Sequence, residues 1–312
     1  MSPTPQSLAP ASRRIDAHQH FWRPARGDYG WLRPDVPALA SICRDVLPAE
    51  LQPLLAIHGV QRTVAVQAAA STAETEFLLA LAAEHDFIGG VVGWVDLSDP
   101  ACVPTLEAWA FDPAFKGRFK GVRPMLQDLP DADWIACAPH PEVMRALLRL
   151  DLRFDALVQP WHLEPLLSFV DRWPDLRVVV DHAAKPQLAR GWDAGGAAAW
   201  AEAWRDGLRE LGARPQVSCK LSGLLTEAGA SARAGGVAGA DALRPVWRQL
   251  LDVFGPGRLI WGSDWPVLNL AADYAAWVTL SEQFIGELEP AARQAVWHDN
   301  AQAFYGLSLG SD

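Results

Sequence analysis

The sequence predicts an α/β protein built as a single (β/α)₈ TIM barrel, and three observations lead to this fold class. About eight short, apolar, mostly β-branched segments recur along the chain, as expected for parallel strands that are buried on both faces. Helical segments alternate with them, which is the order that right-handed crossovers produce. The 312 residues, half of them hydrophobic, suit one large core.

The predicted strands cover residues 14–20, 62–67, 90–96, 119–123, 154–159, 177–182, 216–221 and 258–264. Apolar residues at helical spacing predict helices over 77–84, 141–150, 163–173, 197–211, 243–254 and 271–288. An open doubly wound sheet would show the same alternation, but no G-x-G-x-x-G or P-loop motif follows the first strand. The closed barrel is therefore favoured.

The two ends of the barrel region and one internal segment differ in composition. Residues 1–13 are rich in Ser, Pro, Ala and Gln, without the apolar stretch of a signal peptide, so we expect a disordered tail followed by one domain over 14–312. Residues 224–241 consist mostly of Gly, Ala and Ser, and we expect them to be mobile. Their role is left open by the sequence.

Charge and cysteine content limit the classes of partner. A net charge of −10 argues against nucleic acid or an anionic membrane as the partner. No hydrophobic run is long enough to cross a bilayer. The four cysteines form no C-x-x-C motif and fit free thiols in a reducing compartment. We therefore expect a cytoplasmic protein that acts on a small molecule, and a homo-oligomer is an open alternative.

The first predicted strand carries the main chemical motif. Strand alternation puts Asp16, His18 and His20 on one face, so the two imidazoles can converge on one ion or substrate. A bare H-x-H is a weak motif, because two nearby histidines often serve only as hydrogen-bonding residues. A partner lies near the other end of the chain, where a short apolar strand ends at Asp264 just before Trp-Pro.

Polar residues end most of the predicted strands, and in a barrel these ends meet at one mouth. They are His18, His20, Gln67, Trp94, Asp96, Arg123, Gln159, His182, Lys220 and Asp264. Packing needs none of them, since Val, Ile and Leu would fill the layers. A carboxylate that takes a proton from water, facing several hydrogen-bond donors, is equipped for hydrolysis.

Other interpretations exist for some of these residues. Arg123 could equally form a salt bridge with a neighbouring helix, and the side of the strand on which Lys220 lies is ambiguous by one residue. We expect Val178, Val180 and His182 to face the barrel interior, which turns Asp181 toward the helices. Residues 21–50, with Phe21, Trp22, Tyr29 and Trp31, form either an aromatic wall over the site or packing outside the barrel.

Five stretches of the sequence resemble a known family. They are IDAHQHFW, FKGVRPMLQD, VVDHAAKP, CKLSGL and GSDWPV, spread between Arg14 and Leu307. Together they resemble the amidohydrolase superfamily and, more narrowly, the amidohydrolase-related group that includes the sugar-lactone hydrolases L-fuconolactonase and L-rhamnonolactonase. The resemblance implies a distorted (β/α)₈ barrel.

The resemblance also implies roles for individual residues. Its first-strand H-x-H falls on His18 and His20, its sixth-strand His on His182 and its eighth-strand Asp on Asp264. Where metal-dependent relatives have a fifth-strand His, this chain has Gln159, which removes one usual ligand. His18, His20 and Asp264, with His182 as a further possibility, could still hold one divalent ion, with Zn²⁺ as the first candidate. A metal-independent enzyme is the alternative.

The expected activity is hydrolysis of a small sugar lactone such as L-fuconolactone. Asp264 would be the general base, with His18, His20, Arg123 and Lys220 stabilising the oxyanion and His182 orienting substrate or water. Further substrate-binding candidates are Gln67, Gln159, Trp94 and Trp22. The alternatives are a metal-dependent decarboxylase or pyrone-type lactone hydrolase of the same superfamily, and a binding barrel without catalysis. The sequence leaves the identity of the lactone open.

Overall fold

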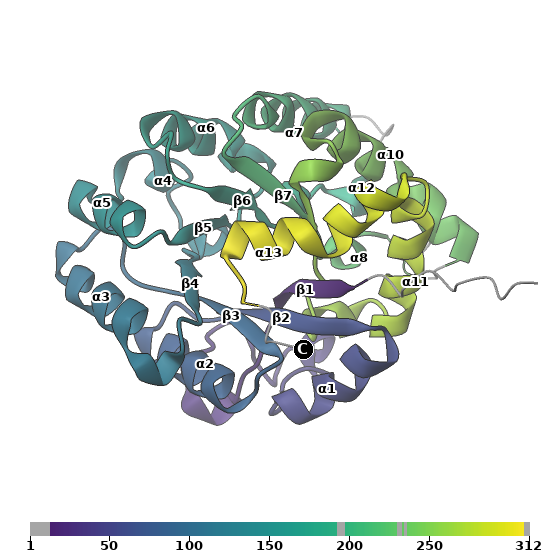
Figure 1. Ribbon diagram of the computed structural model, residues 1–312. Coiled ribbons are helices and arrows are strands. Elements are labelled where there is room, and N and C mark those ends of the chain that lie inside the picture. Colours follow the sequence, from purple (N-terminus) through teal and green to yellow (C-terminus); the bar gives the residue numbers. More distant parts are fainter. Residues whose placement is uncertain (1–12, 192–196, 230–232, 234–235, 309–312) are drawn as a thin grey trace, which may run out of the picture.

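The computed structural model describes residues 13–191, 197–229, 233 and 236–308. Eight parallel strands follow one another around a ring in the order of the chain (Figure 1). They are β1 (Arg14–Gln19), β2 (Val60–Val66), β3 (Ile88–Gly93), β4 (Phe119–Val122), β5 (Arg153–Ala156), β6 (Val178–Val180), β7 (Val217–Leu221) and β8 (Leu259–Trp261). The predicted (β/α)₈ barrel is confirmed.

The ring closes between β1 and β8 just beyond the last residue of β8. A parallel bridge pairs Gln19 with Trp265. Two backbone hydrogen bonds flank it, from the Asp264 N–H to the His18 carbonyl and from the His20 N–H to the Trp265 carbonyl, each 2.8 Å long. The closure is therefore made by the same residues that the sequence singles out for chemistry.

Helices surround the strands (Figure 1). They are α1 (Pro48–Ile57), α2 (Thr72–Glu84), α3 (Val103–Phe111), α4 (Trp134–Cys137), α5 (Pro141–Arg149), α6 (Leu163–Arg172), α7 (Ala197–Gly212), α8 (Leu224–Glu227), α10 (Gly236–Phe254), α11 (Tyr274–Ile285), α12 (Pro290–Gln294) and α13 (Asn300–Tyr305). No described helix combines the length and apolarity that a membrane span requires.

Two segments of unusual composition, 224–241 and 1–13, lie only partly within the described residues. The segment 224–241, expected to be mobile, contains α8 and the first residues of α10, and positions 230–232 and 234–235 within it lie outside the described residues. Of the predicted tail 1–13, only Arg13 belongs to the described part of the chain. The tail stays a prediction.

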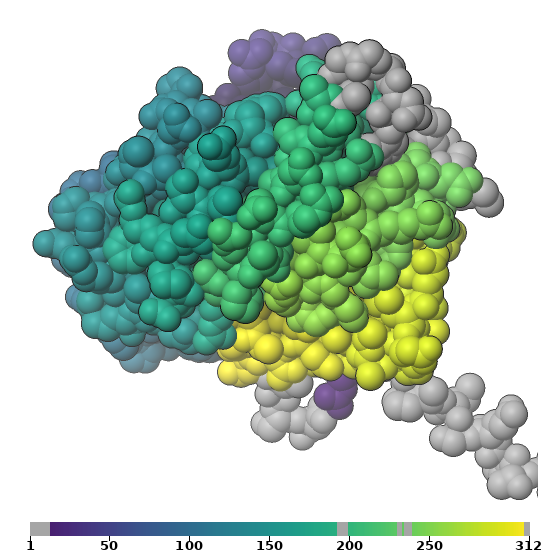
Figure 2. Space-filling model, turned by 90° about the horizontal axis from the view of Figure 1, so that it is seen from above, coloured from purple at the N-terminus to yellow at the C-terminus, as the bar shows by residue number. Residues whose placement is uncertain are grey.

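The barrel interior has an apolar end and a polar end. The apolar end joins one face of several strands to the C-terminal segment and consists of Ile15, Ala17, Val64, Val66, Val92, Val179, Ile260, Ala301, Phe304, Tyr305 and Leu307. Figure 1 shows α13 lying across the centre of the ring, where it closes this end. In Figure 2 this yellow C-terminal segment lies along the lower edge, and the strap formed by residues 21–46 stands at the upper edge in purple.

The structure corrects the predicted orientation of β6. Val179 packs in the interior cluster, whereas Val178 and Val180 pack in the outer core against the helices. Asp181 therefore continues the inward face and is fully buried, opposite to the prediction. The predicted alternation is wrong by one residue, because a strand of three residues offers too few positions to define which face points inward.

The first strand departs from simple alternation as well. Ile15 and Ala17 face the interior, while Asp16 accepts hydrogen bonds from the Tyr274 hydroxyl (3.0 Å) and the Ser263 N–H (2.8 Å). The pairing with β2 shifts between Asp16 and Gln19, which is a β-bulge or similar irregularity. A shift of one residue moves a side chain to the other face, and it brings His18 inward.

The polar end of the interior depends on Tyr305 from the closing helix. Its hydroxyl donates to Asp155 Oδ2 over 2.8 Å. We expect Tyr305→Phe to lower the free energy of unfolding by about 1–3 kcal/mol, because the buried carboxylate loses a donor. Urea unfolding measures this change. Phe111→Leu, at a side chain that is 72% exposed, is the control and should stay within about 0.5 kcal/mol. Equal stability of Tyr305→Phe and wild type would contradict the expectation.

Candidate active site

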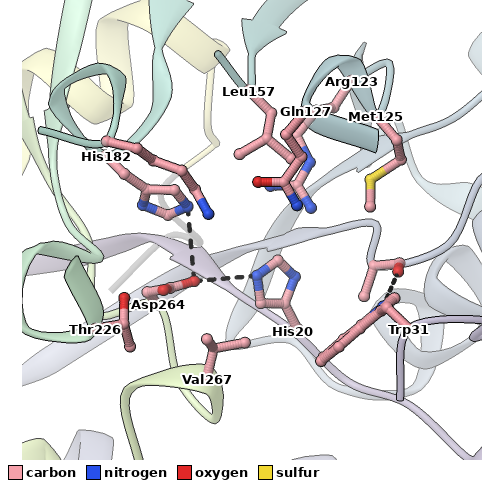
Figure 3. Close-up of a pocket in the computed structure, with 12 residues that line it drawn as sticks. His20, Trp31, Arg123, Met125, Gln127, Leu157, His182, Thr226, Asp264 and Val267 are labelled. Atoms are coloured by element: carbon pink, nitrogen blue, oxygen red, sulfur yellow. Dashed lines mark hydrogen bonds and ion pairs between the residues drawn. The ribbon is translucent and has the colours of Figure 1, made fainter. Parts of the chain in front are cut away.

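Three imidazoles converge on one oxygen of Asp264. Asp264 Oδ1 lies 3.3 Å from His20 Nε2, 3.8 Å from His18 Nε2 and 3.8 Å from His182 Nε2. Figure 3 shows His20 and His182 approaching this carboxylate from two sides. The structure thus brings together four residues that the sequence proposes as a catalytic group. His18 comes from β1, and His20, His182 and Asp264 come from the segments that follow β1, β6 and β8.

The backbone after β6 explains how His182 reaches this point although it lies off the inward alternation. His182, Ala183, Ala184 and Lys185 all have positive φ, between 47° and 58°. Non-glycine residues rarely adopt this left-handed conformation, which costs roughly 1–2 kcal/mol per residue. The turn directs both His182 and Lys185 into the same pocket. Trp204 holds it by donating its indole N–H to the Ala183 carbonyl over 2.7 Å.

Hydrogen bonds on the far side of each ring fix the orientation of two histidines. His20 Nδ1 lies 2.7 Å from the Val66 carbonyl, and because a carbonyl only accepts, Nδ1 carries the hydrogen. His20 Nε2 is then the nitrogen that faces Asp264. His182 Nδ1 lies 2.9 Å from the Ser222 hydroxyl, which leaves its Nε2 directed at the same carboxylate. Both rings are aimed by groups outside the pocket.

A buried network of charges lies beside His18. Lys220 Nζ is 3.0 Å from His18 Nδ1, 3.0 Å from Asp181 Oδ1 and 2.5 Å from Asp155 Oδ2. Arg123 Nη1 lies 3.4 Å from Asp181 Oδ2 and 3.4 Å from His18 Nε2. Two cations are therefore compensated by two carboxylates in the interior, as buried charges require.

Burial and these charges shift the pKa values of the group. Burial, with the neighbouring Lys220 charge, lowers the pKa of His18 well below its usual value. Burial also lowers the pKa of His182 to about 4. Burial alone would raise the pKa of Asp264, but the adjacent imidazoles, His182 first, hold it well below its usual range. At neutral pH the site therefore presents an ionised Asp264 beside a neutral His182.

His20, His182 and Asp264 border a pocket with a volume of about 180 Å³, whereas His18 is fully buried and does not line it. Its lining consists of His20, Trp31, Ala68, Arg123, Met125, Gln127, Leu157, His182, Lys185, Thr226, Asp264 and Val267. Arg123 is anchored there by the Gln67 carbonyl, which accepts from Nη2, and the Gln67 amide donates in return to the Arg123 carbonyl over 2.6 Å. Gln67 therefore supports Arg123 and does not line the pocket.

The structure places other predicted substrate-binding residues away from this lining. Lys220 is fully buried beneath it. Trp22 is fully buried within the strap itself, where it donates its indole N–H to the Ile42 carbonyl over 3.1 Å. Trp94 borders a neighbouring cavity. Gln159 begins the turn after β5, where its N–H donates to His162 Nδ1, and Leu157 lines the pocket from this segment.

The aromatic wall expected from residues 21–50 is present in part. Trp31 lines the pocket, and its indole N–H donates to the Ala68 carbonyl over 2.7 Å. Trp22 packs edge-on against Trp31 with ring centres 5.4 Å apart and so supports the wall from behind. Phe21 belongs to the outer core, as the alternative interpretation had it.

Several pocket residues escaped the sequence analysis. Met125, Gln127 and Lys185 lie inside the stretches FKGVRPMLQD and VVDHAAKP, so a signal was available for them. Val267 ends the stretch GSDWPV and had the same signal, whereas Leu157 and Thr226 carried none, because loop geometry alone brings them to the pocket.

The donor atoms fit one divalent ion. Facing atoms of His18, His20 and Asp264 all lie within 4.8 Å of one another. Two ligands of a tetrahedral Zn²⁺ with bonds of about 2.0–2.1 Å lie about 3.3–3.4 Å apart, close to the 3.3 Å between His20 Nε2 and Asp264 Oδ1. The Val66 carbonyl behind His20 is the outer partner that metal-binding histidines usually have.

A second ion does not fit equally well. His18, Asp181 and His182 also group their donor atoms within 4.8 Å. However, Lys220 Nζ already lies 3.0 Å from both Asp181 Oδ1 and His18 Nδ1. The ammonium group supplies the positive charge at that position.

Comparison with known proteins decides the family. The amidohydrolase family model matches residues 15–307, nearly the whole described chain. The chain belongs to the amidohydrolase family. This amidohydrolase is 47% identical to the L-fucono-1,5-lactonase of Burkholderia ambifaria, over 96% of this chain and 97% of that protein. It is 39% identical to the L-fucono-1,5-lactonase of Burkholderia multivorans, over 96% and 98% of the two chains. The predicted family is confirmed.

Solved structures agree with this assignment. A zinc-bound amidohydrolase from Burkholderia multivorans superimposes with a TM-score of 0.83 at 37% identity, covering 95% of this chain and 99% of that one. A probable 2-pyrone-4,6-dicarboxylic acid hydrolase from Acinetobacter baumannii reaches a TM-score of 0.70 at 16% identity, over 94% and 99% of the chains. The second likeness shows a shared fold alone.

Gly223 makes room for His182, and this gives a test of the site. A Cβ at Gly223 would lie 2.4 Å from His182 Nδ1, whereas a Cβ at Gly117, with nearly the same φ, meets nothing within 4 Å. We expect Gly117→Ala to lose roughly 1–2 kcal/mol from the left-handed backbone, and Gly223→Ala to lose more, because its methyl group also collides with the buried imidazole. Only Gly223→Ala should displace the imidazole and lower turnover, by about 10²-fold.

Crystal structures and kcat values of the two variants provide the comparison. Gly117→Ala should keep the His182 ring in place and retain wild-type turnover. If Gly223→Ala also retained wild-type turnover, the position of His182 would not matter for the chemistry.

Proposed function

We propose that this amidohydrolase hydrolyses the ester bond of a small sugar lactone and releases the sugar acid, with L-fucono-1,5-lactone as the first substrate to test. The observation that carries the proposal is the ionised Asp264 held against His20 and His182 in a pocket of about 180 Å³ that also contains Arg123. Support comes from the 47% identity to an L-fucono-1,5-lactonase over 96% of the chain.

Asp264 has the properties of the general base. Its carboxylate takes a proton from a water molecule as the water oxygen attacks the lactone carbonyl carbon. The resulting tetrahedral intermediate carries its negative charge on the former carbonyl oxygen. The C–O bond to the ring oxygen then breaks, and Asp264 returns the proton to that oxygen. His20 and His182, whose Nε2 atoms flank the carboxylate, position the water.

Arg123 is the group that stabilises the oxyanion. Its guanidinium lines the pocket while the Gln67 carbonyl and Asp181 fix its orientation, so it needs no rearrangement during the reaction. Removing such a donor typically costs about 10²–10³ in rate. Lys220 does not line the pocket and acts through its contacts with His18 and Asp181. Lys220 is therefore a positioning residue in this mechanism.

Two further residues are suited to recognise a polyhydroxylated substrate. The Gln127 side-chain amide points into the pocket in Figure 3 and has no hydrogen-bond partner among the described residues, so both its donor and its acceptor are available to ring hydroxyls. Lys185 lines the same pocket and pairs with Glu227 over 3.5 Å at the rim. Its charge suits the carboxylate of the sugar acid that forms.

A divalent ion, with Zn²⁺ as the first candidate, would be held by His18, His20 and Asp264. Such an ion would polarise the carbonyl and lower the pKa of a bound water molecule. The proton transfers from water and to the ring oxygen are carried out by Asp264. We further expect a cytoplasmic enzyme, and the oligomeric state stays open between a monomer and a homo-oligomer.

A panel of aldonolactones, assayed with a pH indicator, tests the function. We expect wild-type turnover of at least one sugar lactone and a fall in kcat of about 10²–10⁴-fold in Asp264→Asn, because the amide cannot accept a proton. The variant should still fold, since Asn has the same shape and tolerates the positive φ of 62° at this position. It loses the stabilisation at neutral pH that the lowered pKa of Asp264 reflects, so its melting temperature is measured alongside kcat. Asp128→Asn, at an exposed carboxylate near the pocket, should keep full activity. Flat traces for every lactone would refute the proposal.

The pKa shifts predict the pH dependence. Because the pKa of His182 is lowered from 6.5 to about 4 and that of Asp264 is lowered as well, both groups are in their active forms well below neutral pH. We expect kcat/KM to stay level from about pH 8 down to about pH 5 and to fall as His182 gains a proton near pH 4. Initial rates corrected for spontaneous hydrolysis give this profile. A rise centred near pH 6.5 would mean that His182 titrates like an exposed imidazole.

A further inference from the structure

A second cavity adjoins the catalytic pocket. It has a volume of about 240 Å³, and Met125 lines both cavities. Neighbouring residues of two loops line the two cavities. Ala68 and Arg123 border the catalytic pocket, and Ala70 and Pro124 border the second cavity. The two cavities therefore lie on either side of one side chain.

The Met125 side chain separates the two cavities and can change its conformation. Its thioether side chain has three rotatable bonds and is only half-buried, so it can move without disturbing the core. Figure 3 shows Met125 at the edge of the catalytic pocket, beside Arg123 and Gln127. If the Met125 side chain moves, a molecule bound at the catalytic group can reach the second cavity.

The lining of the second cavity combines flat apolar surfaces with a few polar groups. Trp94, just after β3, and Trp134, the first residue of α4, are both half-buried, and neither indole N–H is bonded to another residue in the described part of the chain. Asp96 is exposed at the rim, where its Oδ1 accepts from the Ser98 N–H (2.9 Å) and hydroxyl (2.6 Å) while its Oδ2 is unpartnered among the described residues. Val95, Leu97 and Leu129 complete the wall.

This chemistry suits a sugar ring. The C–H face of a pyranose packs on an indole ring, and its hydroxyls can accept from indole N–H groups and donate to the free oxygen of Asp96. A carboxylate at the rim and the net charge of −10 disfavour an anionic group at this position. The volume is similar to that of the catalytic pocket, so each cavity is of a size for one ring.

We propose that the cavity bordered by Trp94 and Trp134 is a second sugar subsite, and that it holds a pyranose linked to the lactone bound in the catalytic pocket. The inference rests on the proposed lactone hydrolysis and extends its substrate class from lactones of single sugars to lactones of disaccharides. Trp94, which the sequence suggests as a substrate-binding residue, contacts the second ring in this arrangement.

Kinetics on matched substrates test the subsite. The probes are L-fucono-1,5-lactone and its derivatives that carry a glucopyranosyl group on O2, O3 or O4. We expect at least one derivative to show a KM about tenfold lower than the parent lactone. Trp134→Ala should remove that advantage and leave kcat and KM for the parent lactone unchanged. Trp173→Ala, which removes a half-buried indole at the end of α6, is the control and should change neither substrate.

Calorimetry separates this inference from the proposed function. The ring-opened acids of the same compounds cannot be hydrolysed, so the difference in affinity between a disaccharide acid and L-fuconate reports on the second ring without turnover. Tighter binding of a disaccharide acid than of L-fuconate, lost in Trp134→Ala at an unchanged melting temperature, supports the subsite even if no lactone is hydrolysed. If the parent lactone is hydrolysed but no disaccharide lactone or acid binds more tightly, the subsite is refuted and the proposed function stands.

Discussion

The structure depends above all on the hydrogen bonds that join the end of β1 to the segment after β8. The Asp264 N–H donates to the His18 carbonyl, and the His20 N–H donates to the Trp265 carbonyl. These bonds close the barrel, and they also set the spacing between the carboxylate and the two imidazoles. Stability and catalytic geometry therefore share one set of contacts, which explains why the chemistry lies where the first and last strands meet.

The polar half of the interior is organised around the same point. Lys220 and Arg123 would be costly to bury alone, and Asp155 and Asp181 compensate them at distances between 2.5 and 3.4 Å. Replacing such a network by apolar residues is often neutral or stabilising. Its value in this barrel is therefore positional, because it holds His18 from one side while Arg123 reaches the pocket from the other.

The sequence predicts the parts that follow from repetition. Strand–helix alternation indicated the barrel, and two motifs at opposite ends of the chain indicated His18, His20 and Asp264 as partners. These predictions succeed because parallel strands necessarily bring their carboxyl ends to one mouth. His182 was also expected at this mouth, but the alternation that predicted it is wrong, and the left-handed turn after β6 brings it there instead.

The turn after β6, the pairing shift in β1 and the surroundings of Lys220 depend on backbone geometry that residue types alone do not predict. Four successive left-handed residues beginning at His182 contain no glycine, so no propensity marks the turn. No residue pattern predicts the shift in pairing after Asp16 either. Lys220 carried no sign of which residues surround it, and its burial beneath the pocket follows only from the closed ring.

The late position of β8 in the chain has a consequence for synthesis on the ribosome. Until residues near Trp265 emerge, β1 has a neighbour on one side only, and its other edge offers unpaired backbone groups to any nearby extended chain. Arg14 and Asp16 lie on this strand, and charged side chains on an open edge disfavour such pairing. In the nascent chain these two charges disfavour aggregation at the open edge of β1. In the finished barrel Arg14 pairs with Glu282, and Asp16 accepts a hydrogen bond from Tyr274.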